Sequence, residues 1–157
     1  MLAVQSAKGD RRHETKVAAV VGSCAPERAR YAEQLRRATD GVHVSARRLS
    51  MSPDPLDEAC ALAQWANTPA GAVIEFPTTT IMTELIGALA DPAAHLEVAA
   101  IVRVVDAAHL LRDLARDDSA RHRAAPWQRE AGVRYAARAM LAATEIEYAS
   151  MVVLVNW

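Results

Sequence analysis

The chain has 157 residues, of which 52% are hydrophobic and 24% charged, and this composition predicts one globular domain with a hydrophobic core. Its 18 basic and 19 acidic residues give a net charge of -1, which argues against a general attraction to nucleic acid or to an anionic membrane. No apolar run is long enough to cross a bilayer, and residues 1–16 lack the apolar core of a secretory signal. We therefore expect a cytoplasmic location and free thiols at Cys24 and Cys60.

The first half of the chain alternates apolar runs of strand length with segments of helical periodicity. Residues 1–15 are polar and aperiodic, and we expect a flexible arm there, ahead of a single domain over residues 16–157. Pro26 stands where a first helical turn tolerates proline, shortly after the run VAAVVG. The expected elements are a strand at 17–22, a helix at 26–39, a strand at 42–49, a loop at 50–55 and a helix at 56–67.

The second half repeats this alternation. The expected elements are a strand at 70–76, a helix at 81–90, a strand at 99–107, a polar stretch from Arg112, a long helix at 128–149 and a strand at 151–157. This order predicts an α/β fold, a three-layer sandwich with a mainly parallel sheet. Ligands of such sheets bind beyond the carboxyl ends of the strands, so functional residues are expected there.

Four segments follow the ends of the predicted strands: residues 22–28, residues 75–80, Asp106 and Asn156. The sequences around them are AVIEFPTTT, IVRVVDAAHLL and ATEIEYASMVVLVNW, in that order after the first strand. Their order and spacing over residues 17–157 resemble the nucleotide-binding domain of the CobW-type GTPases, the metallochaperone group of P-loop NTPases. The predominance of arginine over lysine suits a bacterial, GC-rich source, and we expect an actinobacterial one.

The phosphate-binding loop of that family is degenerate in this chain. A P-loop has the pattern G-x-x-x-x-G-K-[ST], in which backbone N–H groups surround the phosphates, the lysine neutralises them and the hydroxyl binds Mg²⁺. The corresponding window is GSCAPERA, in which Gly22 alone matches. Glu27 replaces the second glycine, Arg28 the lysine and Ala29 the hydroxyl residue, so only a remnant nucleotide site is expected.

The other family positions are also altered. Glu75 and Asp106 are the candidate catalytic residues, because the resemblance implies a role in metal and water organisation for Glu75, but the glycine expected soon after Glu75 is absent. The family's Cys-x-Cys-Cys motif would fall at residues 47–55, which contain no cysteine, and no metal site is predicted. Asn156 lies one residue later than the guanine-recognition asparagine, and Trp157 follows it.

Several single residues allow two interpretations. Cys24 is either a reactive thiol at a helix N-terminus or, as we favour, a partly buried cysteine without chemistry. Glu75 and Asp106 are equally well explained as a remnant site or as caps of strand ends. The five histidines show no metal-ligand spacing with one another or with the cysteines. The three tryptophans are expected to pack in the core, and they are Trp65, Trp127 and Trp157.

The resemblance implies a CobW-like, GTP-binding-family domain with an eroded Walker A motif. We predict a non-catalytic pseudo-GTPase that acts as a binding or regulatory module in zinc or cobalt homeostasis. GTP, Mg²⁺ and Zn²⁺ are cofactors that the family implies and these motifs do not support. One alternative is a residual GTPase or metallochaperone that uses Arg28, Glu75 and Asp106. A second is a protein similar to the ribosome-associated hibernation recruitment factors among actinobacterial relatives. A third is a non-nucleotide α/β module.

The last predicted strand, MVVLVNW, is strongly apolar and ends the sequence, whereas CobW-type proteins continue into a C-terminal domain. We therefore expect a domain truncated at its last strand, as a fragment or a shortened paralogue. A protein partner, the missing domain or a second copy in a homo-oligomer would cover the apolar strand.

Overall fold

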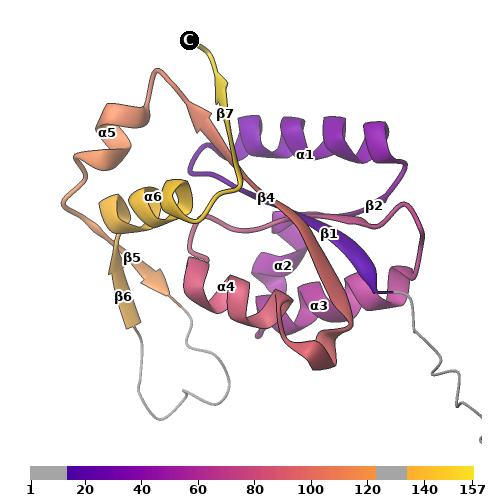
Figure 1. Ribbon diagram of the computed structural model, residues 1–157. Helices are drawn as coiled ribbons and strands as arrows, with labels where there is room; N and C mark the ends of the chain where they lie inside the picture. The colour runs from indigo at the N-terminus through magenta and orange to yellow at the C-terminus, as the bar shows by residue number, and fades with distance from the viewer. Residues whose placement is uncertain (1–13, 123–133) are drawn as a thin grey trace, which may run out of the picture.

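A computed structural model describes residues 14–122 and 134–157 (Figure 1). Its elements in chain order are β1 (Thr15–Val21), α1 (Ala25–Thr39), β2 (Val42–Val44), α2 (Ala46–Met51), α3 (Pro55–Ala66), β3 (Ala72–Glu75), α4 (Met82–Leu89), a 3-10 helix (Pro92–Ala94), β4 (Leu96–Asp106), α5 (Leu110–Leu114), β5 (Ser119–His122), β6 (Arg134–Ala137), α6 (Arg138–Glu147) and β7 (Met151–Val155). The predicted α/β sandwich is confirmed. The expected N-terminal arm lies outside the described residues except at its end, where Thr15 already belongs to β1.

The five strands of the main sheet all run parallel, in the order β2-β3-β1-β4-β7. The central strand is β1, in which Val20 pairs with Glu75 of β3 on one side and with Val102 of β4 on the other. The helices that follow β1 and β3, α1 and α4, lie on opposite faces of the sheet (Figure 1). Neighbouring strands with this property form a topological switch point, and their carboxyl ends are the place for a site.

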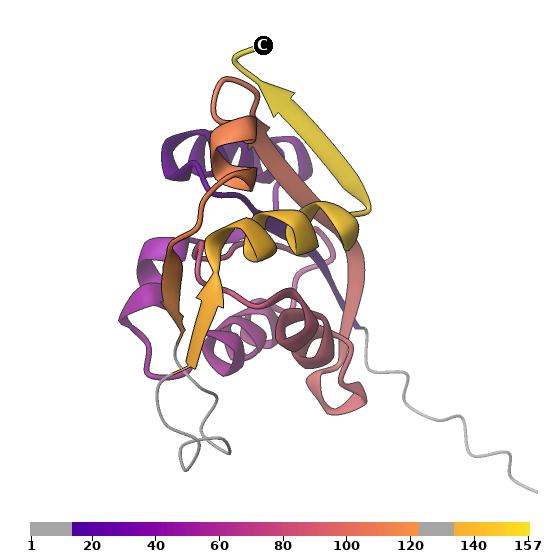
Figure 2. The ribbon, with the colours of Figure 1, turned by 90° about the vertical axis from the view of Figure 1, so that its left-hand side faces the viewer.

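The two faces of the sheet carry cores of different size. On one face Val20 and Val73 pack against Ala32 of α1. The opposite face holds the larger core, to which α2, α3 and α4 contribute side chains such as Leu49 and Leu85. Figure 2 shows α6 on the same side as α4, across the sheet from α1. Each such fully buried side chain stabilises the fold by about 1.5–3 kcal/mol, so these two cores hold the strand ends in fixed positions.

The strand expected at 42–49 is only half right, because β2 ends at Val44 and α2 begins at Ala46. The hydroxyl of Ser45 accepts a hydrogen bond from the backbone N–H of Arg48 (3.3 Å), which is an N-cap. Ala46 and Leu49, three residues apart, are both buried as one helical face. The cap and this spacing outweigh the short alternation that favoured a longer strand.

The long helix expected at 128–149 is also wrong in its first part. Residues 134–137 form β6, which pairs antiparallel with β5, and α6 begins only at Arg138. Residues 128–133 lie outside the described residues. Alanine and arginine are common on helices, but cross-strand pairing with β5 decides the structure of residues 134–137, and helix propensity is too weak to oppose it.

Edge strand β7 is more exposed than its apolar sequence predicts. Met151, Val152 and Leu154 are all classed as exposed, and Val155 packs against the α1 core. β7 has a hydrogen-bonded neighbour, β4, on one side only among the described strands. Within the described residues no helix has the length and apolar character needed to cross a membrane.

The core position expected for the tryptophans is wrong for two of them. Trp65 is 87% exposed and Trp157 is 96% exposed, whereas Trp127 lies outside the described residues. On α3 the buried stripe contains Ala59 and Ala63, and Trp65 points away from it. The size and apolar character of Trp65 and Trp157 therefore do not indicate core positions in this protein.

Candidate functional site

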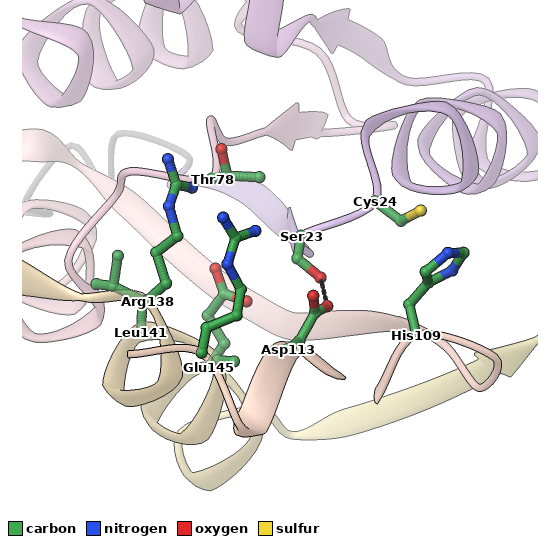
Figure 3. Close-up of a pocket in the computed structure, with 10 residues that line it drawn as sticks. Ser23, Cys24, Thr78, His109, Asp113, Arg138, Leu141 and Glu145 are labelled. Carbon is green, nitrogen blue, oxygen red and sulfur yellow. Dashed lines mark hydrogen bonds between the residues drawn. The ribbon is translucent and has the colours of Figure 1, made fainter. Parts of the chain in front are cut away.

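Gly22, Glu75 and Asp106 lie at the carboxyl ends of β1, β3 and β4, and a pocket of about 160 Å³ lies at the same edge of the sheet. The pocket lies between the loop after β1, the turn after β3 and helices α5 and α6 (Figure 3). Ser23 and Cys24 line it from the first of these, Thr78 from the second, and His109 and Glu145 from the helical side. The edge of the sheet predicted from the strand order is therefore the one that carries a cavity.

Gly22 is required by packing against β4. A Cβ atom on Gly22 would lie 2.6 Å from the carbonyl oxygen of Val104 and 2.9 Å from a guanidinium nitrogen of Arg103. The first of these contacts is with backbone, so it is not relieved by a side-chain movement. The one residue that matches the P-loop glycines thus has a structural reason to be glycine.

Only three residues separate β1 from α1, namely Gly22, Ser23 and Cys24. The helix has begun at Ala25, and its first regular hydrogen bond joins the Arg28 N–H to the Cys24 carbonyl (3.0 Å). In a P-loop a longer glycine-rich segment curls around the phosphates before the helix begins. The residues that would form that segment are here already helical.

Glu27 occupies the N-terminal end of α1. The pKa of Glu27 is lowered, mainly by the neighbouring Cys24 thiol and by its own backbone N–H. The side-chain amide of Asn156 donates to one oxygen of Glu27 at 3.5 Å, and the other oxygen is buried without a hydrogen-bond partner among the described residues. A carboxylate thus holds the end of the helix that would otherwise attract a phosphate.

Arg28 points into the protein and not toward the pocket. Its Nε donates to Oε1 of Glu75 at 2.9 Å, another guanidinium nitrogen donates to the carbonyl oxygen of Gly22, and both partners of the ion pair have side chains only 5% exposed. The second carboxylate oxygen of Glu75 accepts the backbone N–H of Ala46 (3.3 Å) and so holds the start of α2. Both charges are therefore engaged in linking α1, β3 and α2.

Asp106 ends β4 and lies between Cys24 and His109. The Cys24 thiol donates to Oδ2 of Asp106 at 3.5 Å, and Nδ1 of His109 lies 2.6 Å from the same oxygen. The other oxygen of Asp106 accepts the backbone N–H of Ala108, which fixes the orientation of the carboxylate. The pKa of Asp106 is lowered, mainly by its hydrogen bond to His109. Burial, followed by the neighbouring carboxylates of Glu27 and Asp106, raises the pKa of the Cys24 thiol to about 12.

A buried ion pair closes the other side of the pocket. Arg103 of β4 lies 3.0 Å from the carboxylate of Glu145 on α6, with side chains 1% and 3% exposed. Arg103 also donates to the hydroxyl of Ser23, and that hydroxyl donates to Asp113. Burial raises the pKa of Glu145 to about 7, against the opposing effect of Arg103. The pocket therefore has a charged wall whose groups are already paired.

The structure brings the predicted residues together as two separate groups. Gly22, Arg28 and Glu75 form one group inside the protein, and Asp106 lies beside Cys24, which lines the pocket. Asn156 reaches neither group and contacts only Glu27 among the hydrogen bonds described. Ala29, in the next turn of α1, has no side-chain oxygen to offer.

His109 and Glu145 line the pocket and were not predicted as site residues from the sequence. The spacing of Asp106 and His109, three residues apart directly after a buried strand, is a signal that was available. Glu145 had no such signal, because its partner Arg103 is 42 positions away in the numbering and lies on another element.

Comparisons of the chain with protein-family models, curated proteins and solved structures gave no match.

Proposed function

We propose that this chain is a non-catalytic binding module with a P-loop NTPase-like fold, a pseudo-GTPase in the sense of its resemblance to the CobW-type domains. The buried Arg28–Glu75 ion pair carries this proposal. A basic residue at this position must reach the β- and γ-phosphates if it is to assist nucleotide binding. Arg28 instead satisfies a buried carboxylate, and breaking such a pair costs about 3–5 kcal/mol, more than one charged contact with a ligand returns.

Two further features support the loss of nucleotide binding. The short connection from β1 to α1 offers no glycine-rich cradle, and Pro26 removes one N–H donor from the first helical turn. Glu27 adds a negative charge where the phosphates would lie. Ala29 provides no oxygen for Mg²⁺.

The residual GTPase alternative needs Arg28, Glu75 and Asp106 to be available to a nucleotide and its metal. Each of them already has protein partners, at 2.9 Å for Arg28 with Glu75 and at 2.6 Å for Asp106 with His109. Nucleotide binding would have to replace these contacts. This comparison favours the binding module.

The exposed edge of the sheet supports a role in binding another macromolecule. Met151, Val152 and Leu154 of β7 present apolar side chains to solvent on a strand that has a free edge among the described residues. Exposed apolar strands of this kind mark surfaces for protein contacts. We therefore propose a protein partner. A role in zinc or cobalt homeostasis, or one like the hibernation recruitment factors, stays a proposal that rests on the resemblance.

The proposal is tested by thermal unfolding with and without millimolar Mg²⁺ and GTP. A ligand at 100 times its Kd stabilises a protein by about 2.7 kcal/mol, which gives a clear rise in Tm. We expect no rise for the parent chain. The matched control is Arg30→Lys, an exposed arginine on the same helix, which should behave like the parent. The proposal would be contradicted if GTP raised the Tm of the parent chain and did so only when Mg²⁺ was present.

A second arm restores the motif residues together, as Glu27→Gly, Arg28→Lys and Ala29→Thr. Because α1 begins at Ala25, we expect this triple variant to gain no nucleotide-dependent stability. A gain in the triple variant alone would mean that the loop opens easily and was disabled chemically, and the parent would still be a pseudo-GTPase.

A further inference from the structure

Three side chains of different metal-ligand types converge at the mouth of the pocket. Cys24 comes from the N-terminal end of α1, Asp106 from the end of β4, and His109 from the residue before α5. One ligand atom from each, a sulfur, a carboxylate oxygen and an imidazole nitrogen, lies within 4.8 Å of both of the others. Figure 3 shows Cys24 and His109 on the same side of the pocket.

The spacing of these atoms is close to that around a tetrahedral metal ion. With zinc–sulfur and zinc–oxygen bonds of about 2.3 Å and 2.1 Å, the two ligand atoms lie about 3.6 Å apart. The Cys24 sulfur and the Asp106 oxygen are 3.5 Å apart. The imidazole nitrogen is closer to that oxygen, at 2.6 Å, and would have to move outward by about 0.8 Å to reach the same geometry. His109 is 43% exposed, so its ring has room to move, and bonds to the metal would replace its contact with Asp106.

The arrangement does not suit a thiol nucleophile. In a catalytic triad the histidine lies between the nucleophile and the acid, so that it can take the proton. Here Asp106 lies in the middle and contacts both the Cys24 thiol and the His109 ring. The carboxylate therefore holds the thiol proton and opposes formation of a free thiolate.

The charges around the thiol favour a cation. The carboxylates of Glu27 and Asp106 both flank Cys24, and the described groups with a resolved electrostatic effect on this thiol are these two acids. One oxygen of Glu27 is buried without a hydrogen-bond partner among the described residues. The charge of this carboxylate adds to that of Asp106 and attracts a cation to the thiol. This orphaned oxygen is a second observation, separate from the three converging ligands.

We propose that Cys24, Asp106 and His109 form a site for a divalent transition-metal ion, with zinc as the ion that best suits this mixed sulfur, nitrogen and oxygen set. The three elements supply three ligands, and the fourth position is left for water or for Glu27. On binding, the thiol proton passes to solvent and the thiolate bonds the metal. The Ala108 N–H, which holds the other oxygen of Asp106, is the outer contact that orients this ligand.

This inference goes beyond the pseudo-GTPase proposal and does not depend on it. A metal ion at this position would be held by protein side chains alone, whereas the magnesium ion of a P-loop enzyme is held together with nucleotide phosphates. Metal binding is therefore measured without nucleotide. Failure of one proposal leaves the other intact.

The test uses the whole chain, reduced and metal-free, titrated with Co²⁺ as a spectroscopic substitute for zinc. We expect one equivalent to bind, with a thiolate-to-cobalt charge-transfer band and with visible bands of the intensity typical of tetrahedral cobalt. One equivalent of Zn²⁺ should then remove both. Zinc affinity is measured in parallel by competition with a chromogenic chelator.

The variants separate a metal ligand from a structural residue. Cys24→Ser should remove the charge-transfer band and weaken zinc binding by more than about 100-fold, beyond the 10–100-fold typical of outer contacts. His109→Gln, at a half-exposed position, should weaken binding while keeping that band. Cys60→Ala, which removes the buried cysteine of α3, is the matched control and should change neither measurement.

Circular dichroism of each variant shows whether the fold is retained. Because His109 is half-exposed, His109→Gln keeps the test decisive if Cys24→Ser does not fold. Cobalt that binds without a charge-transfer band, or equal zinc affinity in the parent and in a folded His109→Gln variant, would overturn the proposed site.

Discussion

The role of Arg28 in the structure differs from the role that its place in the sequence suggested. By its resemblance to a P-loop we expected it at the lysine position, and in the structure it is buried against Glu75 at 2.9 Å. Arginine reaches further than lysine and binds a carboxylate through a planar fork, which suits this inward contact. The positive charge of Arg28 therefore has a structural partner, the carboxylate of Glu75.

Removing Arg28 alone should destabilise the protein strongly. In Arg28→Met the carboxylate of Glu75 stays buried without its counter-ion, and we expect the free energy of unfolding to fall by about 3–5 kcal/mol. In Arg28→Met with Glu75→Gln neither charge of this pair is left, and much of that loss should be recovered. Urea unfolding measures both. A single variant as stable as the parent would mean that Arg28 is free for a ligand.

Gly22 gives a second residue-scale prediction, with a control inside the same chain. Gly22→Ala should lower the free energy of unfolding by more than about 1 kcal/mol, because the new methyl group meets the Val104 carbonyl. Gly87 lies in α4, and a Cβ atom there meets nothing within 4 Å. Gly87→Ala should therefore stabilise the protein by about 0.5–1 kcal/mol. Equal effects of the two substitutions in thermal or urea unfolding would refute the packing explanation.

Single residues of the site were largely predictable in position and less so in role. Glu75 and Asp106 do lie at the carboxyl ends of neighbouring strands, as the apolar runs before them indicated. The partners of these residues come from distant parts of the chain, such as Arg28 for Glu75, and a single sequence contains no signal for such pairs. These partners decide whether Glu75 and Asp106 are read as a remnant site or as caps of strand ends.

At the scale of elements, α6 is attached to the sheet through the buried pair of Arg103 and Glu145. Burial raises the pKa of Glu145 to about 7, well above its ordinary value of 4.5. Because the folded state holds this proton more tightly than the unfolded state, the contribution of Glu145 to stability is complete below about pH 4.5 and is lost as the pH rises through 7.

We therefore expect the parent chain to lose stability between pH 5 and pH 7.5 relative to a Glu145→Gln variant, which has no proton to release. The measurement is urea unfolding of both proteins across this pH range. Glu147→Gln, two positions further along α6, is the control and should follow the parent. A parent and a Glu145→Gln variant with parallel pH profiles would show that Glu145 is ionised throughout.

The sequence predicted the existence of elements better than their boundaries. Strands with continuous apolar runs, such as β1 and β4, were found because burial on both faces leaves a strong signal. The start of α2 depends on the Ser45 cap and on the Glu75 carboxylate, the second of which comes from β3. Residues of β6 could not be identified because the pairing with β5 outweighs their helical composition.

At the scale of the whole molecule, the alternation of strands and helices was enough to predict the parallel sheet and the edge that carries the pocket. It was not enough to predict which strands are exposed, because β7 has an apolar sequence and yet three of its side chains are exposed to solvent. Continuous apolar runs do not distinguish a buried strand from an edge that another surface covers.

Because β7 is exposed, we expect this edge of the sheet to tolerate substitutions. Leu154→Lys should change the free energy of unfolding by less than about 0.5 kcal/mol, because the side chain is already in solvent. Val104→Lys on the neighbouring strand should unfold the domain, because Val104 is fully buried between the sheet and α1. Circular dichroism and urea unfolding give both results. Severe destabilisation by Leu154→Lys would contradict the open edge and remove the support that it gives to a binding role.

We propose that the P-loop-like fold of this chain does not bind nucleotide. The most direct measurement is a calorimetric titration of the purified protein with GTP, GDP and ATP, each with and without Mg²⁺, at concentrations high enough to detect millimolar binding. We predict no heat of binding for any of the three. Micromolar binding of GTP that requires Mg²⁺ would contradict the account, because Arg28 and Glu75 would then have to leave each other to serve the nucleotide.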